Sequence, residues 1–150
     1  MAAAALTTAA FFGPGAAGAA APSAKAARTL NLSDSANLVQ NNKKGTELKE
    51  SGTAKGNLPG KIYIQLRVAN TKNVTAKIQV YPNSRDAISA TASASYRLVT
   101  SSSASFSGSL NITGGRGRYA KVKGAKLSFS GAVHRPSNSV SVRVSGKISY

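Results

Sequence analysis

Apolar and polar residues alternate with a period of two along most of this sequence, and no other feature limits the possible folds as strongly. Between positions 61 and 68, for example, Ile62, Ile64 and Leu66 alternate with more polar residues. Runs of the same kind cover residues 30–40, 46–58, 74–81, 90–98, 106–112, 127–133 and 140–150. Such a period places successive side chains on opposite faces of a β-strand, one face apolar and one in water. No run of useful length has a helical period, so the sequence predicts an all-β protein with about eight strands.

Turn-forming residues separate the predicted strands. These signals are Asn41-Asn42, Pro59-Gly60, residues 70–73, Pro82-Asn83, Gly114-Gly115 and residues 136–138. Short connections favour antiparallel pairing between strands that follow one another in the chain. Eight such strands with one apolar face can close into an up-and-down barrel, which leaves no exposed edge strand. We therefore predict an eight-stranded antiparallel up-and-down β-barrel, with a two-sheet sandwich as the alternative.

The charge of the chain is strongly one-sided. Its 150 residues include 20 lysines and arginines but 4 acidic residues, which gives a formal net charge of +16, and no acid follows Asp86. Such a field attracts polyanions such as nucleic acids, anionic lipid headgroups or acidic cell-wall polymers. The basic residues are spread over most of the predicted strands, so solubility alone is the simpler explanation. Cysteine is absent, which excludes disulfides and thiolate metal sites.

The densest group of basic residues follows the sixth predicted strand. It comprises Arg116, Arg118, Lys121, Lys123 and Lys126. In a loop these side chains would project from one end of the barrel, and we interpret them as a polyanion-binding site. Domains that bind single-stranded nucleic acids place aromatic side chains on the binding face. Because only Tyr119 lies among these basic residues, we expect non-specific contact with an anionic polymer and no specific nucleic-acid readout.

Residues 1–26 have the composition of a signal peptide. An apolar stretch over residues 2–12 is followed by small residues, with Ala-x-Ala patterns that end at Ala19 and Ala26. No basic residue precedes the apolar stretch, which leaves an alanine-rich tail as the alternative. The stretch is shorter than the ~20 residues that cross a bilayer as a helix. We predict export, cleavage after Ala19 or Ala26, an extracellular or cell-wall location and no membrane span, with residues 27–150 as one domain.

The segment NITGGRGRYAKVKG, residues 111–124, combines glycines with basic residues in the manner of a phosphate-binding loop. Its spacing matches neither the dinucleotide-binding fingerprint nor the P-loop, and both of these motifs need a helix where this sequence predicts a strand. We therefore interpret the segment as a corner of the barrel. Gly114 and Gly115 would end a strand with a positive φ, Tyr119 would fold back over the barrel end, and Gly124 would start the next strand at a crowded position.

This corner resembles a segment of dirigent proteins and allene oxide cyclases. The matching positions are Ile112, Gly114, Gly115, Gly117 and Gly124, with one residue between Gly117 and the aromatic Tyr119. Residues 109–131 carry the resemblance, and they are also similar to small secreted bacterial proteins of unknown function. The resemblance implies an eight-stranded antiparallel barrel that is often a trimer. It transfers no active site, because none of the 4 acidic residues aligns with a catalytic position of the plant enzymes.

Few other residues are candidates for chemistry. His134 is the only histidine and precedes Arg135 in a predicted turn, so we interpret it as a surface residue and not as a catalytic base or metal ligand. Glu47 and Glu50 lie three apart in a strand, so they face opposite sides and cannot act as paired carboxylates. Glu50 is the best candidate for a functional group if it faces inward beside Leu48, and a solvated hairpin charge is the simpler interpretation. We expect no enzymatic activity, no cofactor and no metal.

The barrel interior offers an alternative function. An eight-stranded barrel is filled by its own side chains or holds one small ligand. The many alanines and glycines on the predicted inner face mean that the barrel either flattens or keeps an apolar cavity. A cavity between the alanine-rich strand and the phenylalanine-bearing strands would bind a small apolar ligand or support dirigent-like or isomerase-like activity. The residues expected there are Ala92, Phe106 and Phe129, with Tyr96 as a polar group at the mouth.

Overall fold

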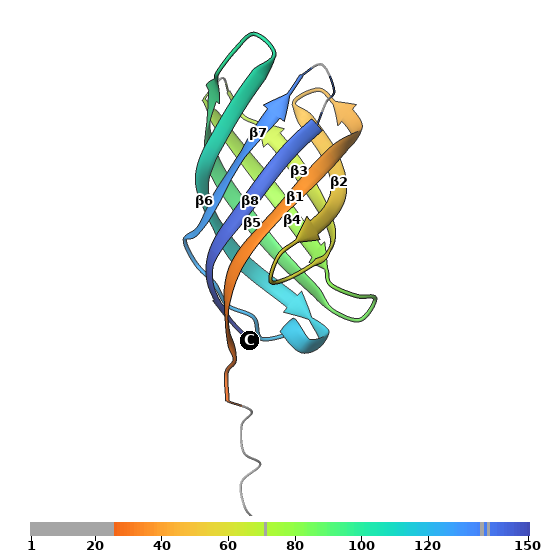
Figure 1. The fold of residues 1–150 in the computed structure, drawn as a ribbon, viewed down its shortest axis with the longest axis vertical. Coiled ribbons are helices and arrows are strands. Elements are labelled where there is room, and N and C mark those ends of the chain that lie inside the picture. The colour runs from red at the N-terminus through yellow and green to blue at the C-terminus, as the bar shows by residue number, and fades with distance from the viewer. Residues whose placement is uncertain (1–25, 71, 136, 138) are drawn as a thin grey trace, which may run out of the picture.

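The alternating segments form eight antiparallel strands that close into a barrel (Figure 1). The structure, a computed structural model, describes residues 26–70, 72–135, 137 and 139–150. The strands are β1 (Thr29–Lys44), β2 (Glu47–Lys55), β3 (Gly60–Val68), β4 (Asn73–Tyr81), β5 (Ala87–Leu98), β6 (Ser103–Arg116), β7 (Leu127–His134) and β8 (Ser139–Ser149). A 3-10 turn, η1 (Gly117–Tyr119), follows β6.

Each strand pairs with the next one in the chain, and β8 pairs with β1 to close the barrel. The closing ladder runs from Thr29 opposite Ser149 to Val39 opposite Ser139. This pairing confirms the predicted up-and-down barrel and excludes the sandwich. Because every strand has two neighbours, no strand edge remains for pairing with another chain.

The apolar residues of the alternating pattern point into the barrel. In β3, Ile62, Ile64 and Leu66 are buried, whereas Lys61 and Tyr63, on the opposite face of the strand, are exposed. The same alternation in the other strands makes the barrel interior the hydrophobic core of the protein. Burial of this apolar surface is the main favourable term in the folding of the chain.

The two ends of the barrel are built differently. One of them, the terminal end, carries the start of β1, Tyr150 and the β2–β3, β4–β5 and β6–β7 connections, and it lies at the bottom of Figure 1. The opposite end carries the β1–β2, β3–β4, β5–β6 and β7–β8 turns. The β6–β7 connection, residues 117–126, is the longest loop between two strands and holds the segment singled out in the sequence.

The glycine-rich corner is real, but its turn lies elsewhere than predicted. Gly114 and Gly115 belong to β6, where they pair with Ser89 and Ile88, and neither has a positive φ. The left-handed residue of the corner is Gly117, with a φ of 67°. Gly124 is crowded as expected, but it lies in the connection and not at the start of β7.

The predicted signal peptide falls on residues outside the described part of the chain, except for Ala26. Among the described residues, no helix has the length and apolar character that crossing a membrane requires.

Candidate functional site

The predicted polyanion site occupies the terminal end, and a buried acid fixes its backbone. Asp86, at the end of the β4–β5 turn, is 7% exposed. Its carboxylate accepts hydrogen bonds from the backbone N–H of Arg118 at 2.9 Å and from the side-chain amide of Asn83 at 2.7 Å. These bonds, together with the nearby guanidinium groups of Arg118 and Arg116, hold the pKa of Asp86 below its ordinary value. Asp86 therefore ties the 3-10 turn to the neighbouring β4–β5 turn.

Two glycines of the corner allow the chain to approach Asp86 and to turn. A Cβ atom on Gly117 would collide with the Asp86 carboxylate, and the positive φ of Gly117 also disfavours other residues. A Cβ atom on Gly115 would collide with the backbone carbonyl of Tyr119. The glycines are thus needed for the close approach of the chain to itself, and the anchored turn is too crowded to cradle a phosphate.

Tyr119 covers the terminal end of the barrel, as the sequence analysis predicted. It is 5% exposed, and its ring centroid lies 4.8 Å from that of Tyr150. Burial raises the pKa of Tyr119 above its ordinary value. Val122 is also buried, so the connection contributes two side chains to the core. Because its ring is buried, Tyr119 cannot stack on a base of a bound nucleic acid.

The remainder of the connection is strapped to the barrel by backbone hydrogen bonds. Lys123 and Ser149 exchange bonds of 2.8 and 2.9 Å, and the N–H of Ile112 donates to the carbonyl of Gly124 at 2.8 Å. The N–H of Lys126 donates to the side chain of Asn111 at 2.8 Å, and Lys126 is held there with a φ of 55°. The basic side chains therefore project from a fixed backbone.

The structure brings all five predicted basic residues to the terminal end and leaves them exposed. These residues are Arg116, Arg118, Lys121, Lys123 and Lys126. Arg116 also donates to the carbonyl of Ser84 at 3.3 Å, which joins the connection to the β4–β5 turn. No ion pair involves any of the five within the described part of the chain. Their charges are therefore available to an anionic partner.

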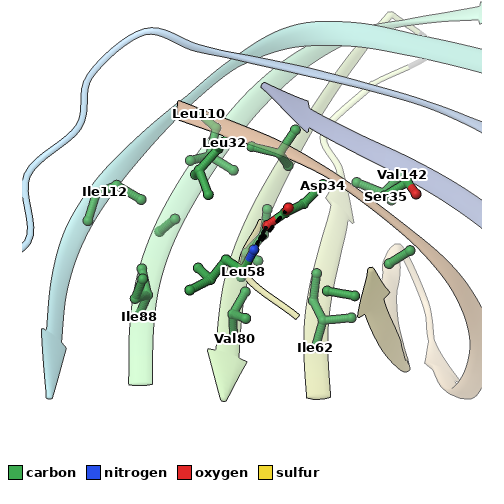
Figure 2. A pocket seen from close by; sticks show the side chains of 15 residues that line it. Leu32, Asp34, Ser35, Leu58, Ile62, Val80, Ile88, Leu110, Ile112 and Val142 are labelled. Atoms are coloured by element: carbon green, nitrogen blue, oxygen red, sulfur yellow. Dashed lines mark hydrogen bonds between the residues drawn. The ribbon is translucent and has the colours of Figure 1, made fainter. Parts of the chain in front are cut away.

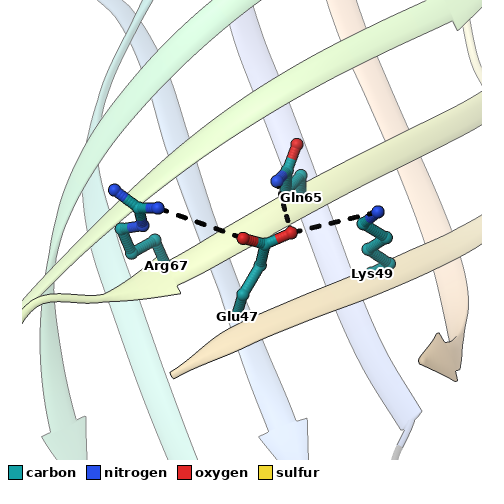
Figure 3. A network of polar contacts seen from close by, with 4 residues as sticks. All are labelled: Glu47, Lys49, Gln65 and Arg67. Carbon is teal, nitrogen blue, oxygen red and sulfur yellow. Dashed lines mark hydrogen bonds and ion pairs between the residues drawn. The ribbon is translucent and has the colours of Figure 1, made fainter. Parts of the chain in front are cut away.

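The basic residues of this end outnumber its acids, because the carboxylate of Asp86 lies beside Arg116 and Arg118 while all five basic side chains are exposed. Asp86 is engaged with the 3-10 turn, and Asp34 and Glu50 face the barrel interior. Glu47 is the acid on the outer wall, where its carboxylate lies 4.0 Å from both Lys49 and Arg67 and accepts a hydrogen bond from Gln65 (Figure 3). This network lies on β2 and β3 near the opposite end, so it does not offset the excess of positive charge at the β6–β7 connection.

A small cavity lies inside the barrel near the terminal end (Figure 2). Its volume is about 50 Å³, and apolar side chains such as Leu32, Ile88 and Leu110 line it. Asp34 reaches in from β1 and accepts hydrogen bonds from the backbone N–H groups of Asn57 and Leu58. Leu58 is thereby held over the interior as part of the wall of the cavity. The cavity is well below the 300–1,000 Å³ of a typical small-molecule site.

The predicted lumen residues lie outside the lining of this cavity. Phe106 and Phe129 pack against each other with ring centroids 5.3 Å apart, and Ala92 is buried beside Ala76 and Leu110 in the sheet. The hydroxyl of Tyr96 accepts a hydrogen bond of 3.2 Å from Arg135 near the opposite end. The four predicted lumen residues therefore do not line the cavity at the terminal end.

Glu50 faces the interior, so the interpretation as a solvated hairpin charge is wrong. Its side chain is 3% exposed and lies on β2 between Gln40 of β1 and Ile64 of β3. One carboxylate oxygen, Oε2, has no hydrogen-bond partner among the described residues. Burial in this apolar setting raises the pKa of Glu50 from 4.5 to about 7. Glu50 is thus a buried acid that changes charge near neutral pH.

Neither a metal site nor a histidine-based site emerges from the described residues. His134 is exposed at the end of β7, and no group of three or more His, Cys, Asp or Glu side chains lies close enough to hold a metal within residues 26–70, 72–135, 137 and 139–150. The anchoring roles of Asp34 and Asp86 were not among the predictions from the sequence. The Asn83–Asp86 spacing is typical of a turn held by side chains and could have indicated one of them.

Taken together, fold and charge define a closed, eight-stranded β-barrel with a rigid basic end. Comparison of the chain with protein families, with curated proteins and with solved structures finds no match.

Proposed function

We propose that the protein is a secreted, non-enzymatic β-barrel that binds anionic polymers through the basic side chains of its β6–β7 connection. One observation carries this proposal. Five exposed cations project from a backbone fixed by Asp86, Tyr119 and Ser149, while the acids of the chain are engaged in turns, in the interior or in the Glu47 network. Because the backbone of the connection is already ordered, polymer binding costs the conformational freedom of the lysine and arginine side chains but not that of the loop.

The binding would be electrostatic and would not read sequence. Lysine and arginine side chains replace the counterions around phosphate, sulfate or carboxylate groups, so affinity falls steeply as salt concentration rises. Each replaced contact on duplex DNA contributes about 0.9 to the slope of log affinity against log salt. The number of participating side chains can therefore be measured directly.

Charge removal at the two barrel ends tests the proposal. Changing Arg116, Arg118 and Lys121 together to Ser should lower the salt concentration that elutes the protein from heparin and reduce the slope for DNA by about 3. The matched control changes Lys43, Lys44 and Lys72 to Ser, which removes the same charge from the opposite end. The control should retain the slope of the parent. Equal losses in both variants would mean that binding follows net charge alone, and the site proposal would fail.

Export and kinship belong to the same proposal. The composition of residues 1–26 supports a cleaved signal peptide, and N-terminal sequencing of protein from the medium would locate the cut.

The segment from Ile112 to Gly124, on an eight-stranded up-and-down barrel, supports kinship with the dirigent and allene oxide cyclase barrels. That kinship would make a trimer the expected assembly, which light scattering can measure.

A second candidate function uses the interior. The apolar cavity of about 50 Å³ supports binding of a small apolar ligand, and the unpartnered oxygen of Glu50, which lies outside the lining of the cavity, is the buried polar group that an isomerase-like activity could use. A ligand larger than the cavity would require Leu58 and its turn to move away from Asp34. Binding of an apolar dye by the Asp34→Ala variant but not by the parent would favour this candidate.

A further inference from the structure

Two tyrosines lie side by side on the outer wall of the barrel. Tyr63 of β3 and Tyr81 of β4 have ring centroids 5.7 Å apart and planes at 79°. Tyr63 is 46% exposed, so much of its ring is open to solvent. The hydroxyl of Tyr81 donates to the side chain of Gln79 at 2.9 Å, which fixes this ring. The pair thus forms a preformed aromatic surface that the core does not use.

The two rings line a shallow groove of about 910 Å³ on the outside of β2, β3 and β4. The groove runs from Thr53 across the tyrosines to Asn83 and Ser84 in the β4–β5 turn. Lys61 lies in its wall, directly opposite Tyr81 in the strand ladder. The lining contains no acidic residue. The groove therefore combines aromatic faces with positive charge.

The groove is continuous with the basic connection. Ser84 lines the groove, and its carbonyl accepts the hydrogen bond from Arg116. Arg85 follows on the same turn and is exposed. A chain that leaves the tyrosines toward the terminal end therefore meets Arg85 and Arg116 before the remaining lysines of the connection.

We propose that this groove binds single-stranded nucleic acid, with bases stacked on Tyr63 and Tyr81 and the phosphate backbone held by Lys61 and the β6–β7 connection. The inference rests on the proposed polyanion binding and specifies its ligand. Proteins that bind single strands without sequence preference combine a positive groove with aromatic rings on which successive bases stack. A duplex cannot offer its base faces, so duplex DNA would use the cations alone.

The groove fits a polysaccharide less well. Sugar hydroxyls are read by polar side chains with free hydrogen-bonding groups, and the polar side chains here are partly engaged. The amide of Asn83 is used within the turn, where it bonds Asp86 and the backbone N–H groups of Arg85 and Asp86. Gln79 accepts from Tyr81. The tyrosine rings and Lys61 are therefore the main groups of the groove that can contact a ligand.

Three ligands and four variants test the proposal. The ligands are a labelled twelve-nucleotide oligothymidylate, the same strand in a duplex with oligoadenylate, and heparin. The variants are Tyr63→Ala, Tyr63→Phe, Tyr81→Ala and, as a control at the opposite end, Leu98→Ala, which alters an exposed side chain of β5. All four act on residues that are not fully buried, and thermal unfolding checks that each variant remains folded.

The parent should bind the single strand more tightly than the duplex. Each tyrosine-to-alanine change should weaken single-strand binding about five- to 160-fold, because stacking contributes about 1–3 kcal/mol per base, and should leave heparin elution unchanged. Tyr63→Phe and Leu98→Ala should bind like the parent. Equal affinity for single strand and duplex with unaffected alanine variants would overturn the inference while polyanion binding stands. Loss of heparin binding in the alanine variants would point to a polysaccharide instead. Failure of the parent to bind any of the three ligands would refute both proposals.

Discussion

At the scale of single residues, Glu50 is unusual because it is an acidic side chain buried in the apolar interior of the barrel. A carboxyl group in an apolar core is tolerated when it is neutral, because desolvation penalises the charged form. Glu50 has Gln40 and Ile64 as its neighbours in the ladders and no partner for Oε2 among the described residues. The other inward-facing acid, Asp34, is engaged with the Leu58 turn. Glu50 therefore carries its proton in the folded state at mildly acidic pH.

The stability of the protein should consequently fall as the pH rises from about 4.5 to about 7. In this window the unfolded chain releases the Glu50 proton while the folded barrel retains it, because the folded pKa is about 7 and the ordinary value is 4.5. Each pKa unit corresponds to about 1.4 kcal/mol, so the free energy of unfolding should drop by about 3 kcal/mol. Urea unfolding at pH 4 and pH 8, on either side of this window, measures this difference.

The Glu50→Gln variant should lose this pH dependence and become more stable than the parent at pH 8. Glu47→Gln is the matched control, because Glu47 lies on the outer wall of the same strand. The control should keep the slope of the parent between pH 4 and pH 8. An unchanged slope in Glu50→Gln would show that Glu50 is not the group that titrates.

At the scale of elements, the β6–β7 connection depends on one glycine and tolerates change at another. Gly117 has a φ of 67°, and a Cβ atom there would collide with the carboxylate of Asp86. Gly114 has no positive φ, and a Cβ atom there would meet nothing within 4 Å. The two positions look alike in the sequence and differ in what surrounds them.

Gly117→Ala should destabilise the protein by about 1–3 kcal/mol, because the left-handed conformation is costly for a residue with a side chain. Gly114→Ala should be neutral or stabilise it by up to about 1 kcal/mol, because alanine restricts the unfolded chain. Denaturant unfolding of both variants checks the difference. Equal destabilisation of the two would contradict this account and favour a turn at Gly114.

Local patterns in the sequence predicted the elements well and their tertiary contacts poorly. The alternation of Ile62, Ile64 and Leu66 identified β3 and its inner face directly, because a period of two is a local property of a strand. The need for glycine at position 115 comes from the nearby carbonyl of Tyr119, which no local pattern shows. Asp34 accepts a hydrogen bond from Leu58 because β1 pairs with β2. Predicting this role of Asp34 would have required the register of that strand pair.

The residues of the candidate site also fall into those that local sequence predicted and those that it did not. The five basic residues of the connection were predicted because they are close together in the sequence. The Tyr63–Tyr81 surface was not, because its two rings come from different strands and meet through the pairing of β3 with β4. Both tyrosines occupied outward positions of the alternating pattern, which was the available signal.

At the scale of the whole molecule, the barrel is closed around a core of unequal side chains. Large residues are accommodated where they lie over a glycine of a neighbouring strand. The ring of Phe106 lies over Gly131, and Leu127 lies over Gly146. Inside the barrel, Phe106 also packs against Phe129, with ring centroids 5.3 Å apart. Near the terminal end, the small side chains of Ala36, Ala54 and Ala90 are part of the lining of the cavity of about 50 Å³.

Two substitutions to larger residues should therefore have opposite effects. Ala92→Phe inserts a ring where the core is packed and should cost about 1–3 kcal/mol. Ala54→Val adds two carbons at the wall of the cavity on a strand that suits a β-branched residue, and should be neutral or stabilise the protein by up to about 1 kcal/mol. Urea unfolding measures both, and an apolar dye added to the parent should report no binding. A tolerated Ala92→Phe together with dye binding by the parent would show that the interior around Ala92 is open to a ligand, because only an unfilled space can accept the added ring without strain.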